Sequence, residues 1–131
     1  RLNLYFPARI RANASMPLLI WIHGGAWISG SKDDVPKPIL AITQLGWVIA
    51  SIDYRLSSQA LYPAQLDDCK AAVQWLQEHA REFRFMQSKY VVAGFSAGGH
   101  LAALLGTTAA SPPVDALDGL GLIAGVVIFS G

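Results

Sequence analysis

The clearest chemical signal in this sequence lies in Gly94-Phe95-Ser96-Ala97-Gly98, which has the pattern Gly-x-Ser-x-Gly. The preceding residues 90–93 are almost all apolar and predict a buried strand, and the small and apolar residues 97–106 predict a helix. A sharp turn from strand to helix lifts a serine hydroxyl clear of the sheet, and flanking glycines leave room for that turn. Ser96 is therefore a candidate nucleophile, and the first helical amides are candidate donors to a developing oxyanion.

Two further polar clusters follow apolar runs. Residues 18–22 have no polar position, as in a strand covered on both faces, and they lead directly into His23-Gly24-Gly25-Ala26-Trp27. Residues 47–52 are apolar except for Ser51 and predict a second buried strand, and Asp53-Tyr54-Arg55 follows it. We expect Asp53 and Arg55 to form a structural ion pair or hydrogen-bond network at the strand end, although contact with a substrate is the alternative.

Strands are also predicted at the two ends of the chain. Residues 2–6 alternate apolar and polar side chains and predict a half-exposed strand, and residues 125–129 predict a fourth strand of the sheet, which we expect to be exposed. A helix is predicted that is capped by Ser31 or Asp33, has Pro36 in its first turn and ends at Gly46. The buried stripe of this helix is expected to consist of Ile39, Leu40, Ile42 and Leu45.

A long helix is predicted from Ala64 onward. Apolar residues recur there at spacings of three and four and make one face: Leu66, Cys69, Val73, Leu76, Ala80 and Phe83. The opposite side is expected to be exposed and carries Asp67, Lys70, Gln74, Gln77 and Arg81.

The alternation of strands and helices predicts an α/β fold with three layers, α/β/α, around a mostly parallel sheet. In such sheets ligands bind at the carboxyl ends of the strands. All three polar clusters stand at such ends, so we expect them to converge on one edge of the sheet.

Composition narrows the class of partner. The 131 residues carry a formal net charge of +1 and only 15% charged residues, which gives no basic surface for nucleic acid. The single cysteine, Cys69, excludes an internal disulfide, and Asp67 and Asp68 have no further ligands near them in sequence, so we expect no metal site and no cofactor. The apolar residues 119–131 are fewer than the roughly 20 that a membrane-spanning helix needs.

The start of the chain has no apolar segment typical of a signal peptide, but it also lacks an initial methionine. We therefore leave the compartment open between secreted, periplasmic and cytoplasmic, and we leave the oligomeric state open.

The four motifs His23-Gly24-Gly25-Ala26-Trp27, Asp53-Tyr54-Arg55-Leu56, Tyr62-Pro63-Ala64 and Gly94-Phe95-Ser96-Ala97-Gly98 occur in order along the chain. Together they resemble the α/β-hydrolase fold, in particular esterases related to hormone-sensitive lipase and the acetyl-xylan and feruloyl esterase-like enzymes. The resemblance runs from about residue 18 to the end. It implies that residues 1–131 are the N-terminal part of a single α/β-hydrolase domain.

The resemblance also implies roles for individual residues. Ser96 would be the nucleophile of a carboxylic ester hydrolase, and the backbone amides of Gly24, Gly25 and Ala97 would form the oxyanion hole. Ala26 replaces a third glycine of the lipase-like pattern, so it is a weaker candidate for the oxyanion hole than Gly24 and Gly25. Trp27 is a candidate for lining the substrate pocket together with Ala26, against a simple packing role. The substrates implied are short-chain, acetyl-type esters, with plant polysaccharide as one carrier of them.

The general base and the acid of a catalytic triad follow the nucleophile in this fold. After Ser96 the sequence contains one histidine, His100, and two carboxylates, Asp115 and Asp118. We expect His100 to point one helical turn away from Ser96, and we expect both aspartates to be loop and helix-cap residues. His23 is expected to hold the shape of its own loop. The triad is thus incomplete, and we expect these 131 residues alone to have little or no esterase activity.

Several alternatives stay open at this stage. An arylformamidase or a serine peptidase would use the same scaffold and the same acyl transfer. A non-catalytic binding module of this fold, or an inactive fragment, is the alternative from a different class. A flavodoxin-like or nucleotide-binding sheet is disfavoured because neither Gly-Gly loop has a phosphate-binding spacing.

Overall fold

The computed structural model of the protein describes residues 2–8, 15–25, 31–33, 35–56, 64–110 and 122–129. Five strands form one sheet: β1 (Leu2–Tyr5), β2 (Met16–Ile22), β3 (Val48–Ile52), β4 (Phe85–Phe95) and β5 (Leu122–Phe129). The helices are α1 (Lys37–Leu40), the 3₁₀ segment η1 (Ala41–Leu45), α2 (Ala64–Glu78), α3 (Ala80–Phe83) and α4 (Ala97–Ala110).

The strand order in the sheet is β1-β3-β2-β4-β5. β1 runs antiparallel to β3, and every other neighbouring pair is parallel. At the carboxyl end of β2, Ile22 pairs with Ile52 of β3 on one side and with Gly94 of β4 on the other. The carboxyl ends of β3, β2 and β4 therefore lie side by side at one edge of the sheet.

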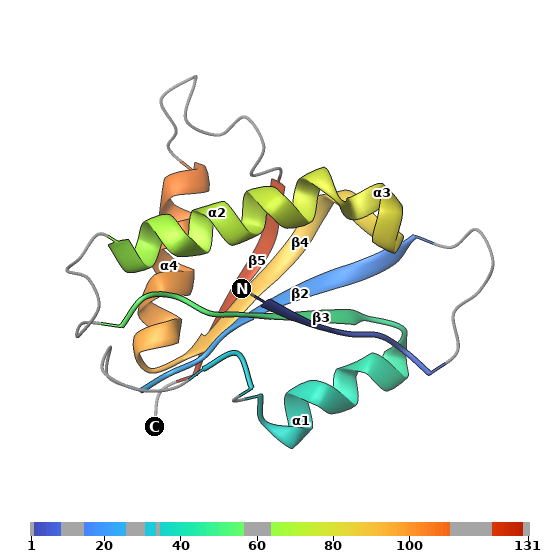
Figure 1. The fold of residues 1–131 in the computed structure, drawn as a ribbon, viewed down its shortest axis with the longest axis horizontal. Helices are drawn as coiled ribbons and strands as arrows, with labels where there is room; N and C mark the ends of the chain where they lie inside the picture. The colour runs from blue at the N-terminus through green and yellow to red at the C-terminus, as the bar shows by residue number, and fades with distance from the viewer. Residues whose placement is uncertain are drawn as a thin grey trace.

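Helices cover both faces of this sheet, as the sequence predicts. The larger core lies between the sheet and α2, α3 and α4, and it includes Ile20, Val73 and Leu101. A smaller core on the opposite face joins Leu19, Trp21 and Ile49 to Ile39 of α1. Figure 1 shows α1 on the side of the sheet opposite to α2. The predicted three-layer α/β/α class with a mostly parallel sheet is confirmed.

The helix predicted to end at Gly46 is shorter and more tightly wound than expected. Its N-cap is Pro36, without a side-chain cap, so the prediction that Ser31 or Asp33 caps it is wrong. After one turn the chain continues as the 3₁₀ segment η1, and Gly46 ends it with a left-handed φ of 90°. Leu45 is 77% exposed and does not belong to the buried stripe, because the tighter 3₁₀ winding rotates it away from Ile39.

The long helix predicted from Ala64 is divided at His79, where α2 ends and α3 begins. Its predicted apolar face is buried from Leu66 to Ala80, and Phe83 packs against the same core. Gln77 is only 7% exposed, so its predicted place on the exposed side is wrong.

β5 forms one edge of the described sheet. Its side chains Val126, Val127, Ile128 and Phe129 are between 37% and 54% exposed. The predicted fourth strand therefore exists, and these side chains are only partly covered by the described residues, in agreement with the expected exposure of this strand.

Candidate active site

Ser96 lies between the end of β4 and the start of α4, as the sequence predicts. Its φ is 54°, a left-handed value that side-chain-bearing residues rarely adopt. The side chain is exposed. Two backbone bonds hold the turn: the Ser96 N–H donates to the Phe129 carbonyl at 2.9 Å, and the His100 N–H donates to the Ser96 carbonyl at 3.0 Å. The turn thus presents the serine hydroxyl outward and starts α4 directly behind it.

The two glycines of the Gly-x-Ser-x-Gly pattern are needed because backbones meet there. A β-carbon on Gly94 would lie 2.3 Å from the Gly98 carbonyl oxygen. One on Gly98 would lie 1.9 Å from the carbonyl oxygen of Ile22, which ends β2. Neither neighbour is a side chain that can move aside, so only glycine allows α4 to start this close to β2 and β4.

The loop after β2 packs closely against the turn between β4 and α4. A β-carbon on Gly24 would lie 2.7 Å from the carbonyl oxygen of Phe95, the residue before Ser96. Gly25 has a φ of 127°, which excludes most other residues. The structure therefore brings Gly24, Gly25 and the start of α4 at Ala97 to the neighbourhood of Ser96.

His23 stabilises this loop from within. Its side chain is buried, and Nδ1 contacts the Gly24 carbonyl oxygen at 2.7 Å. Because a carbonyl oxygen only accepts, Nδ1 carries the proton in this contact. Nε2 is buried and has no hydrogen-bond partner among the described residues. This contact agrees with the predicted role of His23 in holding the shape of its loop.

Tyr54, after β3, fixes the same loop from the neighbouring strand. Its hydroxyl donates to the His23 carbonyl oxygen at 2.9 Å. Its ring stacks on the His23 imidazole with centroids 4.3 Å apart and an angle of 10° between the planes. Burial raises the pKa of Tyr54, and the nearby Cys69 adds to the effect, so the phenol remains a donor.

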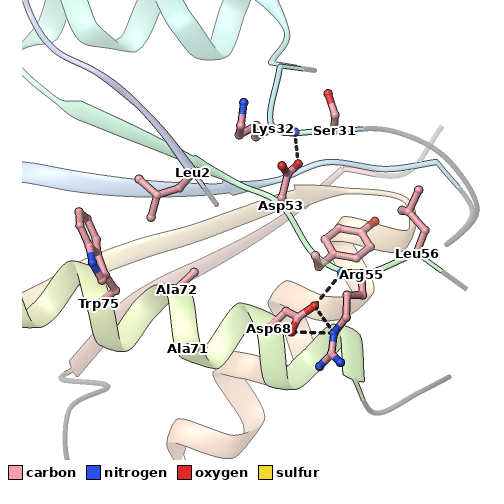
Figure 2. Close-up of a pocket in the computed structure, with 11 residues that line it drawn as sticks. Leu2, Ser31, Lys32, Asp53, Arg55, Leu56, Asp68, Ala71, Ala72 and Trp75 are labelled. Atoms are coloured by element: carbon pink, nitrogen blue, oxygen red, sulfur yellow. Dashed lines mark hydrogen bonds and ion pairs between the residues drawn. The ribbon is translucent and has the colours of Figure 1, made fainter. Parts of the chain in front are cut away.

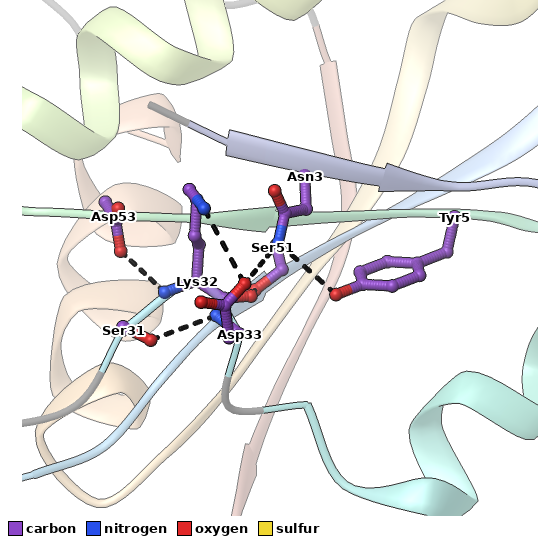
Figure 3. Close-up of polar contacts among 7 residues, drawn as sticks. All are labelled: Asn3, Tyr5, Ser31, Lys32, Asp33, Ser51 and Asp53. Atoms are coloured by element: carbon purple, nitrogen blue, oxygen red, sulfur yellow. Dashed lines mark hydrogen bonds and ion pairs between the residues drawn. The ribbon is translucent and has the colours of Figure 1, made fainter.

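The segment that follows the loop is tied to β3 (Figure 3). The Lys32 N–H donates to the Asp53 carboxylate at 2.5 Å, and the Ser51 hydroxyl donates to the Lys32 carbonyl at 2.6 Å. Asn3 of β1 donates to the Asp33 carboxylate at 2.8 Å. The chain is therefore held at His23 and at Lys32, before and after residues 26–30, by β3 and the residues that directly follow it.

Arg55 pairs with Asp68 of α2 (Figure 2). Its Nε lies 2.9 Å from one carboxylate oxygen and 3.1 Å from the other, and its backbone N–H donates to the same carboxylate at 2.7 Å. The hydrogen bond and the charge of Asp68 raise the pKa of Arg55, which stays protonated. The predicted structural network for Asp53 and Arg55 is confirmed.

A pocket of about 1040 Å³ opens beside this network, between β1, the end of β3 and α2. It is lined by Lys32, Asp53, Arg55 and Trp75 among others, and neither Ser96 nor Gly24 is among its lining residues (Figure 2). We assign it no part in the chemistry at Ser96.

The remaining sequence-predicted residues fall into two groups. His100 lies in the first turn of α4 and is exposed. Ala26, Trp27, Asp115 and Asp118 lie outside the described residues, so their predicted roles stay predictions. Sequence reasoning missed Tyr54 and Ser51, because neither a tyrosine after a strand nor a serine within one indicates its partner about 20 to 30 positions away.

The family model BD-FAE matches residues 2–119 of this sequence. The chain belongs to the BD-FAE family. The matched range includes the residues at all three strand ends described above, 23–25, 53–55 and 96. The resemblance to α/β-hydrolase esterases that the motifs indicate is thereby confirmed.

Three proteins that are similar to this BD-FAE chain carry the name esterase. Esterase LipC of Mycobacterium tuberculosis is 40% identical over 101 residues, which are 76% of this chain and 25% of LipC. Esterase 2 of Thermogutta terrifontis, phosphonylated by cyclosarin, superposes with a TM-score of 0.82 at 27% identity over 98% of this chain and 50% of that one. A truncated carbohydrate esterase from gut microbiota gives a TM-score of 0.74 at 29% identity over 92% of this chain and 44% of its own.

The chain thus spans about a quarter of the length of the curated relative LipC. Within the described residues, no helix is both long enough and apolar enough to cross a membrane.

Proposed function

We propose that the protein containing this chain is a carboxylic ester hydrolase in which Ser96 is the nucleophile. The observation that carries the proposal is the meeting of two backbones: Gly24 packs against Phe95, directly beside an exposed serine with a left-handed φ. A serine raised on such a turn, with backbone amides beside it, suits attack on an ester carbonyl.

In this mechanism the Ser96 Oγ attacks the carbonyl carbon and the carbonyl oxygen becomes an oxyanion. The amides of Gly24, Gly25 and Ala97 are the proposed donors to that oxygen, and helix α4 adds the positive end of its dipole. The bond to the alcohol then breaks and leaves an acyl group on Ser96, which water hydrolyses in a second step. A general base must accept the serine proton, and we assign this role to no described residue.

We further propose short-chain, acetyl-type esters as substrates, with acetylated plant polysaccharide as one source. The support is twofold: the motifs of the chain resemble acetyl-xylan esterase-like enzymes, and one similar structure is a carbohydrate esterase. Ala26 and Trp27 are the proposed lining of the substrate pocket.

The test uses the full-length protein that contains this chain and p-nitrophenyl esters of two, four and eight carbons. We expect kcat/KM to be highest for the acetyl ester and acetate to be released from acetylated xylan. Ser96→Ala should lower kcat at least about a thousandfold, because the acyl-enzyme cannot form.

Thr43→Ala provides the matched control, since it removes a hydroxyl from η1, away from the β4–α4 turn, and should leave kcat unchanged. Hydrolysis of N-formylkynurenine or of peptide anilides in place of the esters would identify an arylformamidase or a peptidase. Full activity in Ser96→Ala, or no hydrolysis of any of these compounds, would contradict the proposal.

A further inference from the structure

The loop after β2 contains two consecutive peptide groups that each accept one side-chain hydrogen bond. The His23 carbonyl accepts from the Tyr54 hydroxyl at 2.9 Å, and the Gly24 carbonyl accepts from His23 Nδ1 at 2.7 Å. In a planar trans peptide the carbonyl and the following N–H point in opposite directions. Holding the His23 carbonyl therefore sets the direction of the Gly24 N–H, and holding the Gly24 carbonyl sets that of the Gly25 N–H.

The two side chains that make these contacts also support each other. Tyr54 is 5% exposed and His23 is 1% exposed, and their rings are stacked at 4.3 Å. Neither ring can tilt without disturbing the other, because buried side chains are closely packed. The directions of the two amides are therefore coupled through one stacked pair.

The His23 carbonyl is also confined on a further side. A β-carbon on Gly98 would lie 2.5 Å from the same oxygen, so the backbone of α4 lies close against it. The oxygen is thus held between the Tyr54 hydroxyl and the first turn of the helix that follows Ser96. The peptide between His23 and Gly24 is positioned relative to Ser96 itself.

We propose that Tyr54 is a positioning residue for the oxyanion hole: its hydrogen bond to the His23 carbonyl aims the Gly24 N–H and strengthens it as a donor. This inference rests on the proposed function. A hydrogen bond to a carbonyl polarises the whole peptide group, which makes the N–H on its other side a better donor. The contribution of Tyr54 is then largest when the substrate oxygen carries its full negative charge, in the transition state.

The expected signature is a change in kcat without a change in KM. Removing an oxyanion donor altogether costs about a hundredfold to a thousandfold in kcat. Tyr54→Phe leaves the donor in place but releases its direction, so we expect a smaller loss, roughly tenfold, with KM within about twofold of the wild type. Affinity for a trifluoromethyl ketone, which forms an oxyanion on the serine, should fall by the same factor as kcat.

The experiment uses the full-length protein, with kcat, KM and the trifluoromethyl ketone dissociation constant measured for the wild type and Tyr54→Phe. Tyr90→Phe is the matched control: Tyr90 is also a buried tyrosine, 2% exposed, but it pairs with Leu18 near the opposite end of the sheet. Tyr90→Phe removes the same atom from the core and should leave all three constants unchanged.

Two results would overturn the inference: a Tyr54→Phe protein with kcat within twofold of the wild type, or an equal loss of kcat in Tyr90→Phe. If Tyr54→Phe does not fold, 3-fluorotyrosine at position 54 keeps the ring and supplies a more acidic hydroxyl, which is a stronger donor. A higher kcat then supports the inference, and an unchanged or lower kcat overturns it. A wild-type protein without esterase activity contradicts the proposed function first, whereas an active wild type with an unaffected Tyr54→Phe contradicts only this inference.

Discussion

Ser96 keeps a backbone conformation that is unfavourable for its residue type. Its φ of 54° is one of two positive values among the described non-glycine residues, and the other is 64° at Arg84. A non-glycine residue in this region costs on the order of 1–3 kcal/mol when the surrounding structure holds it there. At Arg84 the left-handed residue simply ends α3, whereas at Ser96 it directs a hydroxyl outward.

Substitution with glycine should distinguish the roles of the positive φ at Ser96 and at Arg84. Ser96→Gly is expected to raise the free energy of unfolding by about 1 kcal/mol, because glycine adopts a positive φ without strain, and to abolish hydrolysis. Arg84→Gly should give a similar gain in stability and keep full activity. Urea unfolding and ester hydrolysis of the full-length variants are the measurements. A Ser96→Gly protein less stable than Ser96→Ala would contradict the interpretation of φ as strain.

At the scale of elements, the site depends on how closely α4 approaches β2 and β4. The approach is permitted by glycines at positions 94 and 98, where any β-carbon would meet backbone atoms. Backbone cannot move aside as a flexible side chain can, so the sheet and the helix would have to separate. The same separation would displace Ser96 from the loop after β2.

Gly98→Ala is therefore expected to destabilise the protein by about 3 kcal/mol or more and to remove activity. Gly125→Ala is the control, because a β-carbon there would lie 4.0 Å from Val91 Cγ2, an ordinary contact. It should change stability by less than about 1 kcal/mol. Thermal unfolding of both variants provides the comparison, and similar melting temperatures for the two would show that the close approach at Gly98 is not limiting.

The central strands β2 and β3 were predictable from sequence because their apolar runs leave little choice, whereas residues 85–89 of β4 were not predicted as part of a strand. Residues 18–22 and 48–52 are buried at every position, as a doubly covered strand requires. The helices were less predictable. Periodicity cannot distinguish a helix from the 3₁₀ winding that exposes Leu45, nor locate the break at His79, because both depend on tertiary packing.

The candidate site was predictable where local sequence determines geometry. The position of Ser96 follows from the motif, and the convergence of the strand ends follows from the parallel sheet. The hydrogen bond from Tyr54 to the His23 carbonyl joins residues 31 positions apart, and it depends on the register between β2 and β3. No local pattern contains that information.

At the scale of the whole molecule, the larger core buries three groups that can lose a proton at high pH. Burial raises the pKa values of Cys69, Tyr54 and Tyr90, and Cys69 is fully buried. The charge of nearby Asp68 raises the pKa of Cys69 further, and the charge of Cys69 does the same for Tyr54. The unfolded chain releases its thiol proton from about pH 8.5 upward, whereas the folded protein keeps it. The folded state then binds more protons, so its stability falls as the pH rises.

This core should therefore make the protein sensitive to alkali. Between pH 7 and pH 9.5 the Cys69 thiol alone is expected to lower the free energy of unfolding by about 1 kcal/mol. Cys69→Ala should be less stable at pH 7 because it leaves a cavity, but it should lose less stability between the two pH values. Urea unfolding at both pH values measures this difference. An equal loss in the wild type and in Cys69→Ala would contradict the assignment to the thiol.

The central claim is that Ser96 is the nucleophile, and covalent labelling tests it most directly. The full-length protein is incubated with a fluorophosphonate, digested and analysed by mass spectrometry to locate the adduct. A related esterase, that of Thermogutta terrifontis, is phosphonylated by cyclosarin, so this class of reagent is appropriate. We predict one adduct, on Ser96, that disappears in Ser96→Ala; an adduct on another residue, or none together with ester hydrolysis that survives Ser96→Ala, would contradict the account.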